Sequence, residues 1–82
     1  MYLGVKSVQA QPNFRLRITF ENGERRIFDV TPYLDHGAFR ELRQPSLFNA
    51  VRVDFDTVAW PNGVDLCPET LYEESVAIGA DQ

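Results

Sequence analysis

The sequence has too few cysteines and histidines for several common kinds of site. It contains one cysteine and one histidine among 82 residues. A single cysteine cannot form an internal disulfide, and these two residues cannot supply the four ligands of a structural zinc site. We therefore expect no metal and no cofactor, and a fold stabilised by packing in a reducing compartment.

Long apolar runs are also missing. No stretch of about 18 consecutive apolar residues, the minimum for a membrane-spanning helix, occurs in the chain. The N-terminal residues MYLGVKSVQA have neither the apolar core nor the cleavage pattern of a signal peptide. These absences predict a cytoplasmic protein with no membrane association.

Positive charge is scarce, because the formal net charge is −4 and the pI is about 4.7. Nucleic-acid phosphates require many lysines and arginines, so direct nucleic-acid binding is not expected. The charge is nevertheless uneven, since acids gather in the last fifth of the chain while four arginines occupy the first third. These candidate contacts for a protein partner are Arg15, Arg17, Arg25 and Arg26.

Apolar residues, by contrast, make up 44% of the sequence, which suffices for one compact core. The length predicts a single domain over residues 1–82. The segment 14–20 alternates apolar and polar residues and is predicted to be a half-buried strand. A turn at Glu21-Asn22-Gly23 leads to a returning strand at 25–30.

The length of this hairpin loop can be predicted from the register. A two-residue loop would place Phe28 opposite Arg17, so apolar side chains would face guanidinium groups. A three-residue loop instead pairs Leu16 with Phe28 and Arg15 with Asp29, with Gly23 in the left-handed conformation of a bulged turn. We expect the three-residue loop.

The remaining elements complete an α+β fold: a small antiparallel sheet of about four to six strands, covered on one face by a C-terminal helix and short central helical turns. A two-residue loop at Asp56-Thr57 is expected to pair Phe55 with Val58 and Val53 with Trp60. The other expected segments are a strand at 3–10, helical turns capped by Thr31 and Ser46, a helix at 38–43, an extended piece at 64–66 and a helix from Pro68 to Gly79.

Four landmarks together resemble a known family. They are FENG at 20–23, FDVTP at 28–32, GAFREL at 37–42 and WPNGVDLCPETLY at 60–72. The pattern resembles the small bacterial domains of unknown-function family 2442, over nearly the whole chain. The resemblance implies an α+β fold with an antiparallel sheet and no established activity. It also implies relatives joined to a helix-turn-helix DNA-binding domain, and others encoded beside small partner proteins in a toxin–antitoxin-like arrangement.

The closing stretch also carries the candidates for chemistry. Cys67 before a helix start could act as a nucleophile with His36 as its base, but we favour a structural role for both. Asp65 and Glu69 could act as paired carboxylates only if both lay on the same helix. Pro68 instead predicts a helix that begins after Asp65. We therefore expect Asp65 to accept backbone hydrogen bonds and Glu69 to interact favourably with the helix dipole.

No glycine-rich phosphate loop or catalytic triad order occurs, so we expect no enzyme and no catalytic residue. The first hypothesis is a non-catalytic protein-interaction module of a small bacterial regulatory or toxin–antitoxin-type system, with a homodimer as a further expectation. The alternative is a small-ligand-sensing domain whose pocket involves Trp60, Asp65 and Tyr72. The positions expected to be structural are Asn22, Gly23, Asp29, Asn62, Gly63, Asp65, Pro68 and Glu69.

Overall fold

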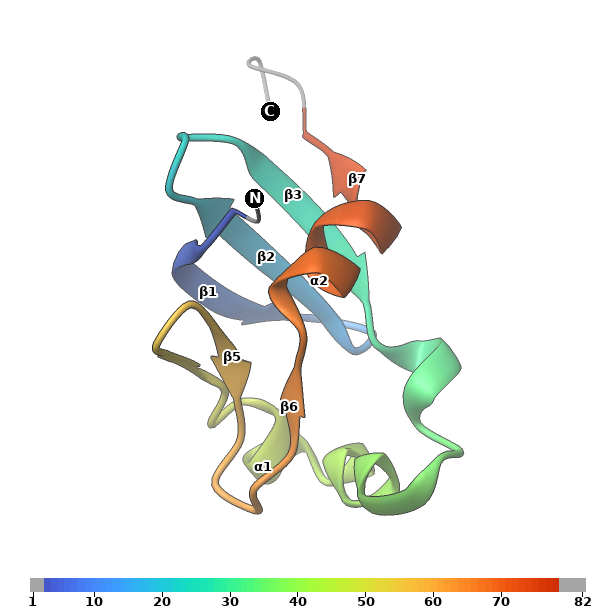
Figure 1. Ribbon diagram of the computed structural model, residues 1–82. Coiled ribbons are helices and arrows are strands. Elements are labelled where there is room, and N and C mark those ends of the chain that lie inside the picture. The colour runs from blue at the N-terminus through green and yellow to red at the C-terminus, as the bar shows by residue number, and fades with distance from the viewer. Residues whose placement is uncertain (1–2, 79–82) are drawn as a thin grey trace.

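The computed structural model describes residues 3–78, and its strands form two antiparallel sheets (Figure 1). A four-stranded sheet has the order β1 (Val5–Gln11), β2 (Arg15–Phe20), β3 (Arg25–Asp29), β7 (Val76–Ala77). A three-stranded sheet has the order β4 (Arg52–Asp54), β5 (Thr57–Ala59), β6 (Asp65–Leu66). The predicted α+β class is confirmed, although the strands are divided between two sheets.

The helical segments are short and come mostly from the middle of the chain. They are the 3-10 helices η1 (Thr31–Tyr33) and η2 (Gly37–Arg43) and the α-helices α1 (Pro45–Phe48) and α2 (Pro68–Glu74). Figure 1 shows α2 lying across one face of the four-stranded sheet. None of these helices, which lie within residues 3–78, is long and apolar enough to cross a membrane.

The hairpin of β2 and β3 has the predicted register. Leu16 lies opposite Phe28, and Arg15 lies opposite Asp29. Gly23 has a φ of +91°, the left-handed conformation that the bulged three-residue loop requires. This part of the fold follows from apolar alternation and from the position of one glycine.

Strand β1 has an irregular apolar spacing, and a bulge accounts for it. The register with β2 shifts between Val5 and Ser7, which inserts one extra residue. Val5 is buried and Val8 is half-buried against the core, although their spacing of three would place them on opposite faces of a regular strand.

The connection between β1 and β2 contains two left-handed residues that are not glycine. Asn13 has a φ of +64° and Phe14 a φ of +60°. Strand β2 therefore begins at Arg15, one residue later than predicted. The ring of Phe14 packs edge-on against Phe48, with 5.3 Å between the ring centroids.

The predicted helix caps are wrong in both central turns. Thr31 lies inside η1, and its backbone N–H donates to the Asp29 carboxylate at 3.0 Å. Helix α1 begins at Pro45, so Ser46 lies within it. A proline at the first helical position has no N–H to satisfy, which explains why the helix starts there.

The predicted register of β4 and β5 is also wrong. Val53 lies opposite Val58, and the tight turn consists of Phe55 and Asp56. The prediction was shifted by two residues, which keeps every side chain on its own face, so alternation does not distinguish the two registers. Phe55 consequently lies at the hairpin tip, 93% exposed.

Helix α2 ends at Glu74 rather than at Gly79, which lies outside the described residues. Ser75 is extended, with a ψ of 165°, and the chain then pairs with β3 as strand β7. Val76 lies opposite Ile27, and the Ile78 N–H donates to the Arg25 carbonyl at 2.9 Å. The tail thus extends the sheet instead of prolonging the helix.

The core lies against the inner face of the four-stranded sheet, beneath α2 and beside the smaller sheet. The Val5 N–H donates to the Asp56 carbonyl at 2.9 Å, which ties β1 to the tip of the β4–β5 hairpin. The buried cluster consists of Val5, Leu16, Ile18, Phe20, Phe28, Val30, Leu34, Leu42, Phe48, Val58, Trp60, Val64, Leu66 and Leu71.

Candidate functional site: the outer face of the four-stranded sheet

The outer face of the four-stranded sheet carries three of the four predicted arginines, together with the apolar Ile27 and Val76. Leu16, Ile18 and Phe20 are buried on the inner face, so Arg15 and Arg17 between them point outward. Arg25 lies opposite Thr19 and shares this outer face. Because α2 covers the inner face, the outer face is on the far side of the sheet in Figure 1.

The neighbours of these arginines are mostly small and uncharged. Arg17 lies between Gln9 on β1 and Ile27 on β3. Arg17 and Arg25 help to line a shallow hollow of about 390 Å³, together with Ser7, Val8, Gln9 and Thr19. Arg15 lies between Gln11 and Asp29, so its charge is partly offset, and Arg17 and Arg25 form the more basic part of the face.

Arg26, the fourth predicted arginine, lies on the opposite face of the sheet. Its Nε donates to the Ser75 hydroxyl at 2.6 Å, and a terminal nitrogen donates to the Ser75 carbonyl at 2.9 Å. The guanidinium carbon lies 4.4 Å from the centre of the Tyr72 ring. Arg26 therefore anchors the end of α2 to β3. Strand alternation was the signal that separates it from Arg25.

Glu24 and Tyr72 form a second link between α2 and the sheet. The Tyr72 hydroxyl donates to the Glu24 carboxylate at 2.7 Å, and the Asn22 amide donates to the same oxygen at 2.9 Å. These bonds, from Asn22 first and then Tyr72, lower the pKa of the Glu24 carboxyl, and the bond to Glu24 raises the pKa of Tyr72. The Tyr72 ring also packs edge-on against Phe20, at 5.2 Å.

Trp60 is a core residue in this structure. Its side chain is 1% exposed, and its Nε1 donates to the Phe48 carbonyl at 3.0 Å. The Tyr72 hydroxyl donates to Glu24, and the Tyr72 ring lies against the Arg26 guanidinium. A ligand pocket involving Trp60, Asp65 and Tyr72 stays a prediction that these contacts do not test.

The predicted turn after Trp60 forms, and Asn62 holds it together. Gly63 has a φ of +90°, and its N–H donates to the Trp60 carbonyl at 3.0 Å. The Asn62 side chain accepts from the Val64 N–H at 3.2 Å and donates to the Glu41 carboxylate at 2.8 Å. The turn is thus fastened to η2 as well as to itself.

Among residues 3–78, Asp65 accepts none of the backbone hydrogen bonds expected of it. It is exposed on β6, opposite Ala59, while Asn62 supplies the acceptor for the turn. The Asn62 side chain accepts from the Val64 N–H of the turn, so Asp65 is not needed as the acceptor. Asp65 lies on the solvent face of its strand. Glu69 lies in the first turn of α2, as predicted, and Pro68 is the first helical residue.

Cys67 and His36 lie on different connections. Cys67 is exposed between β6 and α2, and His36 is exposed between η1 and η2. Within residues 3–78, no hydrogen bond joins the two side chains, and no three histidine, cysteine, aspartate or glutamate side chains gather as metal ligands do. The described contacts give no support to a thiol nucleophile with a histidine base.

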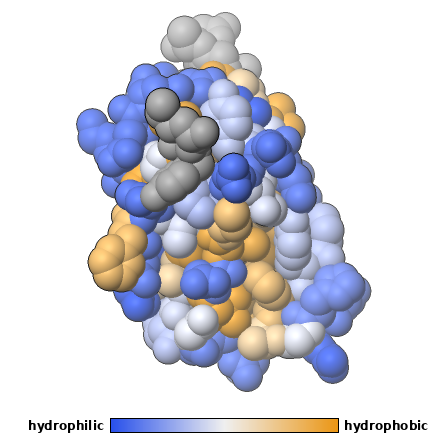
Figure 2. Space-filling view, in the orientation of Figure 1, coloured by the Kyte–Doolittle hydropathy of each residue, from blue (hydrophilic) through white to orange (hydrophobic). Residues whose placement is uncertain are grey.

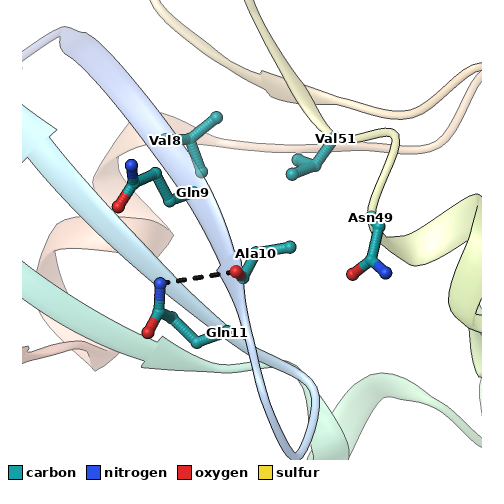
Figure 3. A pocket seen from close by; sticks show the side chains of 6 residues that line it. All are labelled: Val8, Gln9, Ala10, Gln11, Asn49 and Val51. Carbon is teal, nitrogen blue, oxygen red and sulfur yellow. Dashed lines mark hydrogen bonds between the residues drawn. The ribbon is translucent and has the colours of Figure 1, made fainter.

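Two adjoining hollows beside β1 were not predicted from the sequence. The first, about 510 Å³, lies between β1 and the connection from α1 to β4 and is lined by Val8, Gln9, Ala10, Gln11, Asn49 and Val51. Figure 3 shows Val8 and Ala10 pointing toward that connection, whereas Gln9 and Gln11 point away. The second hollow continues along the β1–β2 loop. Their walls come from segments distant in sequence, so no local pattern indicates them.

A family model described as "Protein of unknown function (DUF2442)" matches residues 5–77. The match runs from the first residue of β1 to the last residue of β7, and so covers both sheets. No curated protein and no solved structure matches the chain significantly. The resemblance seen in the sequence is confirmed, and the chain belongs to this family of proteins of unknown function.

Proposed function

We propose that the protein is a non-catalytic interaction module of a small bacterial regulatory or toxin–antitoxin-type system in the cytoplasm. Its partner would be a protein with an acidic surface, bound by the outer face of the four-stranded sheet. The observation that carries the proposal is the location of Arg15, Arg17 and Arg25 on one face that none of the helices in residues 3–78 covers.

The chemistry of this face suits a protein partner. Arginine binds carboxylates through two parallel hydrogen bonds, and it is enriched in protein interfaces. Strands hold the backbone beneath the three side chains, so only the arginine side chains need further ordering on binding. The flanking residues Gln9 and Thr19 supply neutral hydrogen-bonding groups for the rim of an interface.

The distribution of charge would orient the partner. The net charge is −4, and Glu69, Glu73 and Glu74 are exposed on α2, across the sheet from the arginines. An acidic partner is therefore attracted by one side of the molecule and repelled by the other. Such an arrangement speeds correct association and makes it sensitive to salt.

The test is affinity purification with chemical cross-linking from the bacterial host, followed by mass spectrometry. We expect one protein with an acidic surface to be retained by the wild type and lost with Arg17→Glu/Arg25→Glu. Arg40→Glu/Arg52→Glu is the matched control, because it makes the same charge change at exposed arginines elsewhere. If only the bait itself is recovered at native levels, the proposal fails.

A further inference from the structure

The tip of the β4–β5 hairpin carries an apolar residue that folding does not require. Phe55 is 93% exposed and has a φ of +56°. Left-handed turn positions are normally occupied by glycine, asparagine or aspartate, because a bulky side chain is strained there. Figure 2 shows hydrophobic atoms projecting at the left edge of the molecule, where this turn lies in Figure 1.

Such a residue combines two costs, because it exposes an aromatic ring and strains the backbone. Residues whose backbone conformation or exposure is unfavourable for the fold tend to occur at functional positions. A ring at the end of a rigid hairpin has the shape of an anchor that inserts into a pocket on another molecule. The identity of that other molecule can be inferred from the rest of the surface.

The second hollow beside β1 has the matching character. Its volume is about 480 Å³, and more of its wall is apolar than polar. Its lining includes Pro12, Phe14, Pro45 and Phe48, together with Ala10, Gln11, Asn13 and Asn49. Since binding pockets for small ligands begin at about 300 Å³, this hollow can accept a phenyl ring.

The hollow, like the hairpin tip, contains a bulky residue in the strained left-handed conformation. Phe14 is left-handed, with a φ of +60°, and this conformation holds its ring against Phe48 at the wall. The charges beside the two features are opposite. Asp54 directly precedes Phe55, whereas Arg15, whose charge Asp29 partly offsets, directly follows Phe14 and lies opposite Gln11 of the hollow.

From these features we propose that a second copy of this chain docks here, with Phe55 of one copy seated in the hollow of the other. The tip and the hollow are different surfaces, so the contact between copies is heterologous. In a pair, one copy keeps a free tip and the other a free hollow, unless further copies close the assembly into a ring. Of the three arginines on the outer face, only Arg15 lies near the hollow. Arg17 and Arg25 are not involved, so the double variant Arg17→Glu/Arg25→Glu separates this contact from the binding of an acidic partner.

The experiment is sedimentation velocity of the purified chain over a concentration series up to about 1 mM, which covers weak contacts. The variants are Phe55→Asn, which tolerates the left-handed turn, and Asn49→Glu, which places a carboxylate in the hollow to face Asp54. Asn49 is exposed with a right-handed φ of −71°, so both variants should fold. Val76→Thr is the control, because Val76 is the other large exposed apolar residue among residues 3–78.

We expect concentration-dependent association of the wild type and of Val76→Thr. Each of the other two variants should weaken it at least about tenfold, the effect of losing one buried aromatic ring. A mixture of Phe55→Asn with Asn49→Glu should form dimers, since one variant keeps the hollow and the other keeps the tip.

Three results would overturn the proposal. They are a monomeric wild type at every concentration, association unchanged in Phe55→Asn or Asn49→Glu, and a mixture of the two that stays monomeric. Unchanged melting temperatures show that a loss of association does not come from unfolding. Binding of an acidic partner by these variants would remain intact, which separates this proposal from the function proposed above.

Discussion

At the scale of single residues, the conspicuous stretch from Trp60 to Tyr72 is a structural joint. Trp60 fills the core, Gly63 allows the turn, and Pro68 starts α2. The residue that secures the turn is Asn62, because its side chain bonds both the Val64 N–H and Glu41. Asparagine suits this position, since its amide can accept from the turn and donate outward at once.

Asn62→Ala should therefore lower the free energy of unfolding by about 1 kcal/mol, the typical loss for one or two partly exposed hydrogen bonds. Asp65→Ala is the control, because Asp65 is exposed and its removal should change stability by less than about 0.5 kcal/mol. Urea denaturation of both variants measures the difference. Equal effects would mean that Asp65 supports the turn after all.

At the scale of elements, the attachment of α2 depends on Arg26. One guanidinium bonds the hydroxyl and carbonyl of Ser75 and lies over the Tyr72 ring, while Glu24 lies 3.6 Å away. These contacts join β3 to both the last turn of α2 and the start of β7. Arg26 is thus a polar centre shared by α2 and β7.

Arg26→Ala should destabilise the fold by about 2 kcal/mol, because hydrogen bonds to charged groups contribute more than neutral ones. The loss should be local. Amide hydrogen exchange should speed up in α2 and β7 more than in β1 and β2, which pair without help from Arg26. Arg25→Ala, one residue away on the outer face, serves as the control. Uniform loss of protection across all strands would contradict this role.

A further attachment of α2, to Tyr33 of η1, gives a pH dependence. The Tyr33 hydroxyl donates to the Glu74 carboxylate, which raises the pKa of Tyr33 to about 12. The folded pKa exceeds the unfolded value of about 10, so this contribution to stability is complete below pH 10. It is lost as the pH rises through about 12.

Tyr33→Phe should accordingly lower the melting temperature at pH 8 and change it less at pH 12, where the Tyr33 hydroxyl of the wild type is about half ionised. Thermal unfolding followed by circular dichroism at both pH values measures this. A difference between wild type and variant that stays constant across the range would show that the hydroxyl contributes nothing through Glu74.

The elements also show what the sequence could predict. The β2–β3 hairpin was predictable, because alternation and a turn glycine are local signals that leave one consistent register. The register of β4 and β5 was not, since a shift by two residues preserves alternation. The end of α2 was not predictable either, because β7 forms only through pairing with Ile27, which is distant in sequence.

At the scale of the whole molecule, the surface also depends on contacts between segments that are distant in sequence, so local patterns predict it only in part. Strand alternation in the sequence places Arg25 and Arg26 on opposite faces, but only the fold shows that α2 covers the face of Arg26 and leaves that of Arg25 open. The hollows beside β1 join segments about 40 residues apart, so no motif marks them. We therefore propose two binding surfaces: a basic sheet face for an acidic partner, and a tip and hollow for a second copy.

The most direct test of the proposed function is an affinity measurement with the partner identified by cross-linking. Isothermal titration would compare the wild type with Arg17→Glu/Arg25→Glu and with Arg40→Glu/Arg52→Glu. We predict that the first double variant loses at least about tenfold in affinity, the consequence of about 1.4 kcal/mol, while the control retains it. Equal affinities for the wild type and Arg17→Glu/Arg25→Glu would contradict the assignment of the outer sheet face as the binding surface.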